Sequence, residues 1–230
     1  MKKFAIGCLF LVAFSSSAQY GQTVLDKMDV HGSAGTLFRN KVLDRVKEGV
    51  SGTPYLNDMF TPSDIAGAGA RLSTRYNAYK DEIEVQYEDD TFVMPKDDRY
   101  GTVRSITFNY TMELVKYTTS SNEDVYGYLI NLMPNEKVSL YRRERTIMRP
   151  AREADNSYSQ RIPASYDKLS SEYFLKMEGD KIVSFPKNKK ALIGLYPTKS
   201  DAISSFLKSS KTSFKKEGDL MEITKFLGTL

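Results

Sequence analysis

The chain has 230 residues and carries 33 lysines and arginines against 29 aspartates and glutamates, a formal net charge of +4. This length suits one domain, or one domain with an appendage. A single histidine and a single cysteine exclude a zinc site built from several such ligands. The small excess of basic residues gives little support for nucleic-acid binding, so we predict no nucleic-acid partner.

The first 18 residues have the three parts of a secretory signal peptide. Two lysines give a positive start, residues 4–14 form an uncharged apolar run, and Ser16 and Ala18 supply small side chains before a cleavage site. The run is shorter than the roughly 20 apolar residues that cross a bilayer. We therefore predict export to the periplasm or the extracellular space, where association with the outer membrane stays open. The mature chain would start at Gln19 and have no transmembrane segment.

The only cysteine, Cys8, lies inside this predicted signal. A lipoprotein signal places its apolar run before the modified cysteine, whereas most of this run follows Cys8, so soluble export is favoured. Without the signal, the chain has no thiol and no disulfide. Its net charge falls to +2, from 31 basic and 29 acidic residues. We therefore expect packing alone to stabilise the mature protein.

Residues 19–52 are predicted to be a lead segment before the main domain. Within it, residues 36–47 place apolar side chains at a spacing typical of one helical face, although a strand also fits. Gly49 and Gly52 follow as stop signals. The alanine-glycine repeat at residues 66–70 predicts a flexible loop.

Residues 53–186 are predicted to form an antiparallel β domain, because polar and apolar side chains alternate along their segments. Two hairpins are indicated, one that joins residues 81–87 to 91–94 and one that joins residues 173–177 to 181–185. Between them, residues 103–117 predict one continuous strand. Polar turns without intervening helices favour an antiparallel sheet, either a meander or a partly closed barrel.

Residues 187–230 change to a helical period. Short helices are predicted at residues 188–195, after Thr198 as an N-cap, and at residues 219–227. Their apolar stripes should pack on the β domain. The predicted fold class is therefore α+β, a predominantly antiparallel sheet with a short-helix C-terminal segment.

Catalytic signatures are weak in this sequence. A serine or cysteine nucleophile would need His31 as its base, and no serine stands in a Gly-x-Ser-x-Gly turn. There is also no phosphate-binding loop or dinucleotide fingerprint. We therefore predict no cofactor, no metal ligand and no catalytic residue.

Acidic residues between positions 81 and 98 offer one route to enzyme chemistry. Paired carboxylates can hydrolyse glycosides or bind calcium. However, Glu82 and Glu84 fall on the polar side of an alternating strand, and residues 88–90 fall in a turn. A solvated face is therefore the favoured interpretation.

The densest basic stretch contains Arg142, Arg143 and Arg145. In a strand, Arg143 and Arg145 share one side and Arg142 takes the other. Guanidinium groups suit phosphate and carboxylate ligands, so these three residues are candidates for binding an anionic glycan, a lipid headgroup or an acidic patch of an envelope protein. The alternative, which we favour, is an edge strand whose charges protect it from aggregation.

Tyrosines provide the other candidate binding surface. Tyr76 and Tyr79 are proposed as ligand-binding residues on a polar face of the sheet, because tyrosine is enriched at interfaces. Other tyrosines expected on the same face are Tyr110, Tyr126 and Tyr128.

Three segments together resemble a known pattern: residues 52–60, residues 75–84, and the tail from Phe206 to Leu220. They resemble an uncharacterised family of small exported envelope proteins of Gram-negative bacteria. The resemblance implies strands followed by helices and an envelope location. It implies no activity and no site residue.

Three hypotheses for function follow. The first is a non-enzymatic envelope protein that binds a partner or a glycan. The second is a carboxylate-based hydrolase of envelope or external glycans, which would need an acidic pair across a cleft. The third is a scaffold subunit of an outer-membrane complex, which would need an exposed apolar patch.

Overall fold

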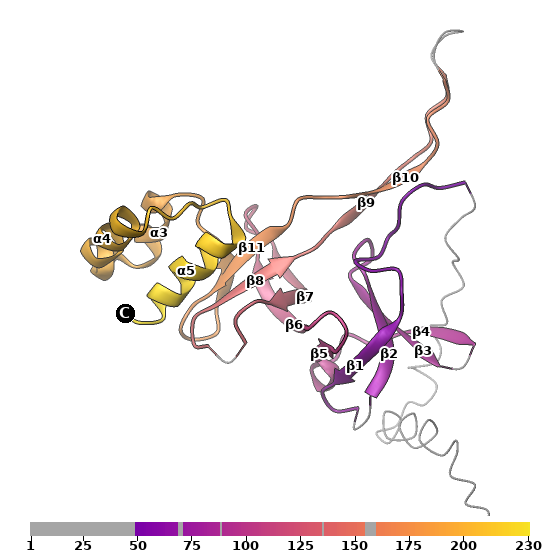
Figure 1. Cartoon of the computed structure of the whole chain (residues 1–230), viewed down its shortest axis with the longest axis horizontal. Helices are drawn as coiled ribbons and strands as arrows, with labels where there is room; N and C mark the ends of the chain where they lie inside the picture. Colours follow the sequence, from indigo (N-terminus) through magenta and orange to yellow (C-terminus); the bar gives the residue numbers. More distant parts are fainter. Residues whose placement is uncertain (1–48, 69–70, 88, 135, 155–159) are drawn as a thin grey trace, which may run out of the picture.

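The computed structural model describes residues 49–68, 71–87, 89–134, 136–154 and 160–230 (Figure 1). The predicted signal peptide, the lead segment before residue 49, and the predicted helix at 36–47 lie outside these residues. In the described part, the chain is mainly β-sheet with three short α-helices at its C-terminal end. The predicted fold class is confirmed.

The first half of the described chain forms one side of a ten-stranded sheet. Its strands pair antiparallel in the order β5-β1-β2-β3-β4. Their bounds are β1 (Thr61–Ile65), β2 (Arg71–Asn77), β3 (Glu82–Tyr87), β4 (Asp90–Val93) and β5 (Thr102–Ser105). A 3-10 turn, η1 (Asp98–Tyr100), precedes β5. The β3–β4 pair is the first predicted hairpin.

Five further strands form a partly closed barrel. They are β6 (Tyr110–Thr118), β7 (Asp124–Asn131), β8 (Ser139–Arg143), β11 (Glu172–Lys176) and β12 (Ile182–Ser184). Neighbours pair antiparallel, and one parallel pairing of Val183 with Thr118 closes the circuit between β12 and β6. The partly closed barrel of the sequence prediction is therefore present, and β11–β12 is the second predicted hairpin.

The continuous strand predicted at residues 103–117 is wrong. The chain turns between Ser105 and Tyr110, so this segment is the hairpin of β5 and β6. Asn109 adopts φ +50°, a left-handed conformation that asparagine accepts more readily than most residues. Ile106 and Phe108 are exposed on the turn.

A two-stranded arm leaves the main body between β8 and β11. It consists of β9 (Thr146–Arg149) and β10 (Ser165–Lys168), which pair antiparallel, and an isolated bridge between Arg152 and Ile162 continues it outward. Figure 1 shows the arm extending away from the sheets and helices. This separate ribbon was not predicted from the sequence.

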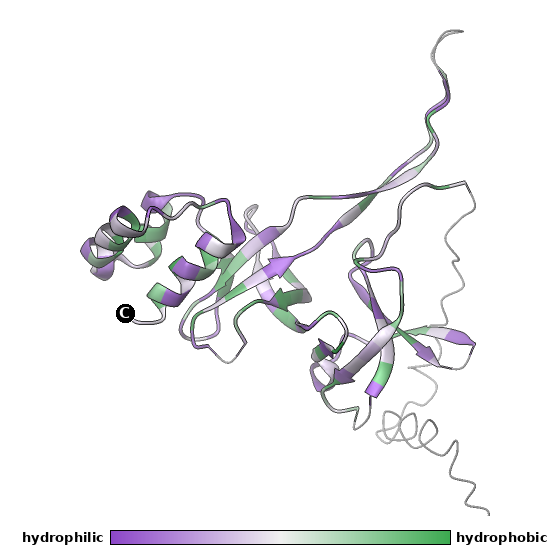
Figure 2. Ribbon diagram, in the orientation of Figure 1, coloured by the Kyte–Doolittle hydropathy of each residue, from purple (hydrophilic) through white to green (hydrophobic). Residues whose placement is uncertain are grey.

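The C-terminal helices are α3 (Lys189–Leu195), α4 (Ser200–Ser210) and α5 (Glu217–Leu227). Asn188 caps α3, because its side chain accepts a hydrogen bond from the N–H of Ala191. The predicted cap at Thr198 is wrong, because Thr198 lies inside a 3-10 turn, η2 (Pro197–Lys199), that precedes α4. In Figure 2 the helices alternate hydrophobic and hydrophilic stretches, as amphipathic helices do.

The barrel strands bury side chains on both faces, because successive residues of a strand point to opposite sides. Inside the barrel lie Tyr117, Leu129, Tyr141, Phe174 and Ile182. Outside it, Leu140 and Leu175 pack in one cluster with apolar residues of all three helices. The helices therefore cover an outer side of the barrel, as predicted. None of the helices in the described ranges is long and apolar enough to span a bilayer.

Candidate binding site at the barrel mouth

The pairing of β8 with β11 sets which side chains meet at each end of the barrel. Tyr141 faces Phe174 in the middle of the barrel interior, and Arg143 faces Glu172 at one end. A pocket of about 430 Å³ opens at this end. The buried ring of Phe174 lies at its base. The pocket is therefore open to solvent at this end of the barrel and is closed at its base by Phe174.

The pocket has walls from parts of the chain that are far apart in sequence. The β6–β7 turn contributes Ser121 and Glu123, and the segment after β12 contributes Lys187. Phe214 and Leu220 come from the C-terminal segment, which forms a further wall. Part of the pocket wall therefore depends on how the C-terminal segment packs beside the barrel.

Two arginines of the pocket share one carboxylate. Arg143 Nη1 lies 3.3 Å from Glu172 Oε2, and Arg145 Nη1 lies 3.5 Å from Glu172 Oε1. The Arg143 guanidinium also lies 5.5 Å from the centre of the Tyr117 ring, within the range of a cation–π contact. The structure thus brings together Arg143 and Arg145, two of the residues singled out by sequence.

The charge of this pocket is slightly positive. Its lining contains Arg143, Arg145 and Lys187 against Glu123 and Glu172, a formal charge of +1. Lys187 makes no ion pair with another residue of the described ranges. Serine hydroxyls and aromatic rings complete the lining, notably Ser171, Ser184, Tyr173, Phe185 and Phe214. Burial raises the pKa of Tyr173 to about 12, so its hydroxyl stays protonated at neutral pH.

Arg142 does not line the pocket. It faces the helices, where its Nη1 lies 2.8 Å from Glu217 Oε2 and its Nε lies 2.7 Å from Glu144 Oε1. Tyr173 also donates a hydrogen bond to Glu217. Glu217 is in the first turn of α5, where a negative charge is favourable. Arg142 thus attaches α5 to the barrel, on the side opposite Arg143.

The tyrosine candidates lie outside this pocket. Tyr76 is only 3% exposed, and its hydroxyl donates a hydrogen bond to Asp81. Tyr128 is equally buried. Tyr79 is 43% exposed and its ring meets that of Tyr166 on the arm edge-to-face at 5.5 Å. The expected tyrosine-rich polar face does not form around Tyr76 and Tyr128, because both belong to the core.

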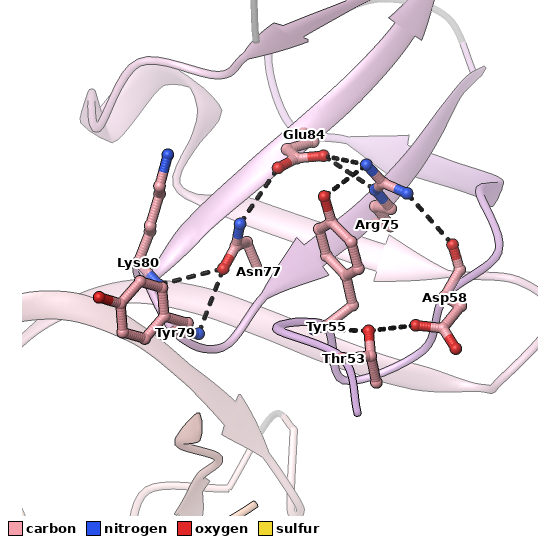
Figure 3. A network of polar contacts seen from close by, with 8 residues as sticks. All are labelled: Thr53, Tyr55, Asp58, Arg75, Asn77, Tyr79, Lys80 and Glu84. Atoms are coloured by element: carbon pink, nitrogen blue, oxygen red, sulfur yellow. Dashed lines mark hydrogen bonds and ion pairs between the residues drawn. The ribbon is translucent and has the colours of Figure 1, made fainter. Parts of the chain in front are cut away.

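Glu84 corrects the prediction of a solvated acidic face. Its side chain is 2% exposed and accepts hydrogen bonds from Arg75 and Asn77 (Figure 3). Residues Arg75 and Glu84 are direct cross-strand partners on β2 and β3. Alternation along one strand shows which side of that strand is polar. It does not show which residue of the neighbouring strand lies opposite, so this ion pair could be found only from the pairing of β2 with β3.

Arg75 joins this buried pair to the segment before β1. Its guanidinium lies 3.6 Å from the centre of the Tyr55 ring and 4.3 Å from that of Phe60, and it donates a hydrogen bond to the Tyr55 hydroxyl. Burial, reinforced by the negative charge of Glu84, raises the pKa of Tyr55 to about 12. The network in Figure 3 fixes residues 53–60 on the sheet. Its groups satisfy one another, which indicates a structural role.

The opposite end of the barrel is acidic. A second pocket of about 390 Å³ is lined there by four carboxylates and two lysines, namely Glu113, Glu136, Glu178, Asp180, Lys137 and Lys176. Glu113 accepts hydrogen bonds from Tyr141 and Asn131. Among the described residues, no three histidine, cysteine, aspartate or glutamate side chains are placed to hold a metal ion. The two mouths therefore differ in sign, and only the one at Arg143 favours an anion.

The Arg143 mouth combines two guanidinium groups with hydroxyls and aromatic rings. Guanidinium groups, hydroxyls and aromatic rings bind polar organic ligands, and the carboxylate of Glu172 is already engaged by two arginines. Comparisons of the chain with protein-family models, with curated proteins and with solved structures find no match.

Proposed function

We propose that this chain is an exported, non-enzymatic binding protein of the cell envelope, which holds a glycan or a glycolipid headgroup in the pocket at the Arg143 end of the barrel. The observation that carries the proposal is the combination of arginines, serine hydroxyls and aromatic side chains around one hollow of about 430 Å³. This volume lies within the range of small-molecule sites.

The lining suits a sugar for two reasons. Hydroxyl groups of a sugar form hydrogen bonds with arginine, serine and glutamate side chains, and all three types line this pocket. The apolar faces of sugar rings pack on aromatic side chains, which Tyr173 and Phe214 supply. Export is supported by the signal-like residues 1–18 and by the resemblance to exported envelope proteins.

The test is calorimetric titration of the protein lacking residues 1–18 with neutral, carboxylated and phosphorylated monosaccharides and short oligosaccharides. We expect binding by the wild type and its loss in Ser184→Trp, which fills the pocket. The matched control is Ser205→Trp, on an exposed position of α4. The chain has no native tryptophan, so fluorescence of each variant reports whether the new side chain is buried. A wild type that binds none of these glycans, or a Ser184→Trp variant that binds as tightly as the wild type, contradicts the proposal.

A second candidate, a subunit of an envelope assembly, is favoured by the arm. Met148 and Ile162 are exposed on it, at 37% and 52%. Beyond the bridge between Ser51 and Ser165, the arm is a two-stranded ribbon, which is marginal in water. Purification from gently solubilised envelopes tests this role. A stoichiometric partner that is lost in the double variant Met148→Ser, Ile162→Ser supports it, and recovery of the protein alone removes it.

A further inference from the structure

We infer that the ligand is anionic, and that its carboxylate or phosphate binds Arg143 and Arg145 by displacing Glu172. This inference rests on the proposed function for the location of the site, and it adds the chemical class of the ligand. In the free protein, Glu172 occupies the place of the ligand and competes with it. The pocket is then a site for a terminal acidic group of a glycan or a phosphorylated headgroup.

The two ion pairs of Glu172 are loose. Their N–O distances are 3.3 and 3.5 Å, whereas well-formed charge-assisted hydrogen bonds measure about 2.7–2.9 Å. Each carboxylate oxygen contacts a different arginine, so neither arginine forms a two-pronged pair with Glu172. A ligand that approaches both guanidinium groups more closely would replace these contacts with shorter ones.

Glu172 can leave without disturbing the core. Its side chain is 44% exposed and it is the first residue of β11, next to the loop that joins the arm to the barrel. The Glu172 carboxylate can therefore turn into solvent once the two arginines bind the ligand. Arg143, by contrast, is held against Tyr117 and is 18% exposed, so it stays in place for the ligand.

The remaining groups of the pocket favour a negative charge. Each guanidinium has five N–H donors, and Glu172 uses a small part of them. Lys187 adds a positive charge that has no ion pair within the described residues, and Glu123 is the one other carboxylate of the lining described there. With Glu172 turned outward, the lining around the ligand carries three positive groups against one negative group.

The test compares three probes of similar size by calorimetric titration: glucose, glucuronate and glucose 6-phosphate. We expect both acidic probes to bind more tightly than glucose, by about tenfold or more, which corresponds to about 1.4 kcal/mol. Rising salt should weaken both acidic probes. The relative affinities of glucuronate and glucose 6-phosphate then distinguish a carboxylate ligand from a phosphate ligand.

Glu172→Gln is the decisive variant. It keeps the size of the side chain and removes the competing charge, so we expect tighter binding of the acidic probes by about tenfold and no change for glucose. Arg145→Gln should weaken the acidic probes by a similar factor. Arg161→Gln, on the arm and paired with Glu153, should change nothing. Thermal unfolding of each variant confirms that it is folded.

The outcomes separate this inference from the proposed function. If glucose and glucuronate bind equally well in the pocket, the proposed binding site is supported, but the inference that its ligand is anionic is wrong. If Glu172→Gln weakens the acidic probes or leaves them unchanged, Glu172 is not a competitor and the inference is overturned. If no probe or glycan binds, the proposed function and the inference fail together.

Discussion

The carboxylate of Asp81 occupies the space that a side chain at Gly127 would need. A Cβ at position 127 would lie 2.4 Å from Asp81 Oδ2. Asp81 follows β2 with φ +55° and accepts hydrogen bonds from the Tyr76 hydroxyl, the Tyr128 N–H and the Lys96 ammonium. The turn after β2 is thus attached directly to β7, which links the first half of the sheet to the barrel.

Substitution of Gly127 tests this link. We expect Gly127→Ala to lower the free energy of unfolding by about 1–3 kcal/mol, because the added methyl group displaces a carboxylate with three partners. Gly194→Ala is the control, since Gly194 lies in α3 and a Cβ added there would have no atom within 4 Å. At position 194, alanine should leave the free energy of unfolding unchanged or raise it by up to about 1 kcal/mol. Urea unfolding curves measure both, and equal effects would contradict the close contact.

Local signals were enough to predict much of this fold. The hairpins β3–β4 and β11–β12 combine alternating strands with polar turns, and at Gly179 the turn adopts φ +89°, which glycine accepts without strain. The helices α3 and α5 follow from apolar residues at helical spacing. Such features depend on residues close in sequence, where spacing is informative.

Features that depend on distant residues could not be predicted. The burial of Glu84 requires Arg75 to lie opposite on another strand, and the separation of the arm from the sheets depends on how β8 and β11 meet. For the site, strand alternation correctly separated Arg142 from Arg143, because it depends only on adjacent positions. The wall from Phe214 and the carboxylate of Glu172 come from elsewhere in the chain, so the pocket itself was missed.

The buried pair of Arg75 and Glu84 should matter far more than an exposed pair. Glu84→Gln leaves the Arg75 guanidinium without its charged partner between two aromatic rings, so we expect a loss of about 3 kcal/mol of stability. Asp64→Asn is the comparison, since the Arg71–Asp64 pair is about half exposed and should contribute little to stability. Chemical unfolding of the two variants gives the difference, and similar losses would show that the network of Figure 3 contributes little.

Arg142 should act on the C-terminal helices and not on the ligand. Arg142→Gln removes the charged contact with Glu217, so we expect faster amide hydrogen exchange in α5 and a loss of about 1–3 kcal/mol of stability. The affinity for acidic probes should stay within about twofold of the wild type, in contrast with Arg145→Gln. Arg104→Gln, at an exposed position of β5, serves as the control for a generic loss of positive charge. Unchanged exchange in α5 would show that apolar packing alone attaches the helix.

Alkaline pH should destabilise the protein through its buried tyrosines. Burial raises the pKa of Tyr55, Tyr117 and Tyr173 to about 12, whereas a tyrosine of the unfolded chain titrates near pH 10. Below about pH 10 both states keep the proton, and the stabilisation is fully present. Between about pH 10 and 12 the unfolded state loses protons that the folded state retains, so the free energy of unfolding falls as pH rises.

Tyr117→Phe isolates one of these groups. The Tyr117 hydroxyl has no hydrogen-bond partner among the described residues, and its ring packs edge-to-face on Phe174 at 4.8 Å, a contact that phenylalanine preserves. We therefore expect the variant to be at least as stable as the wild type at neutral pH and to lose less stability at high pH. Urea unfolding at about pH 8 and about pH 11, with tyrosinate absorbance followed in parallel, measures both effects. If the wild type and the variant lose stability equally, Tyr117 does not contribute to the alkaline transition.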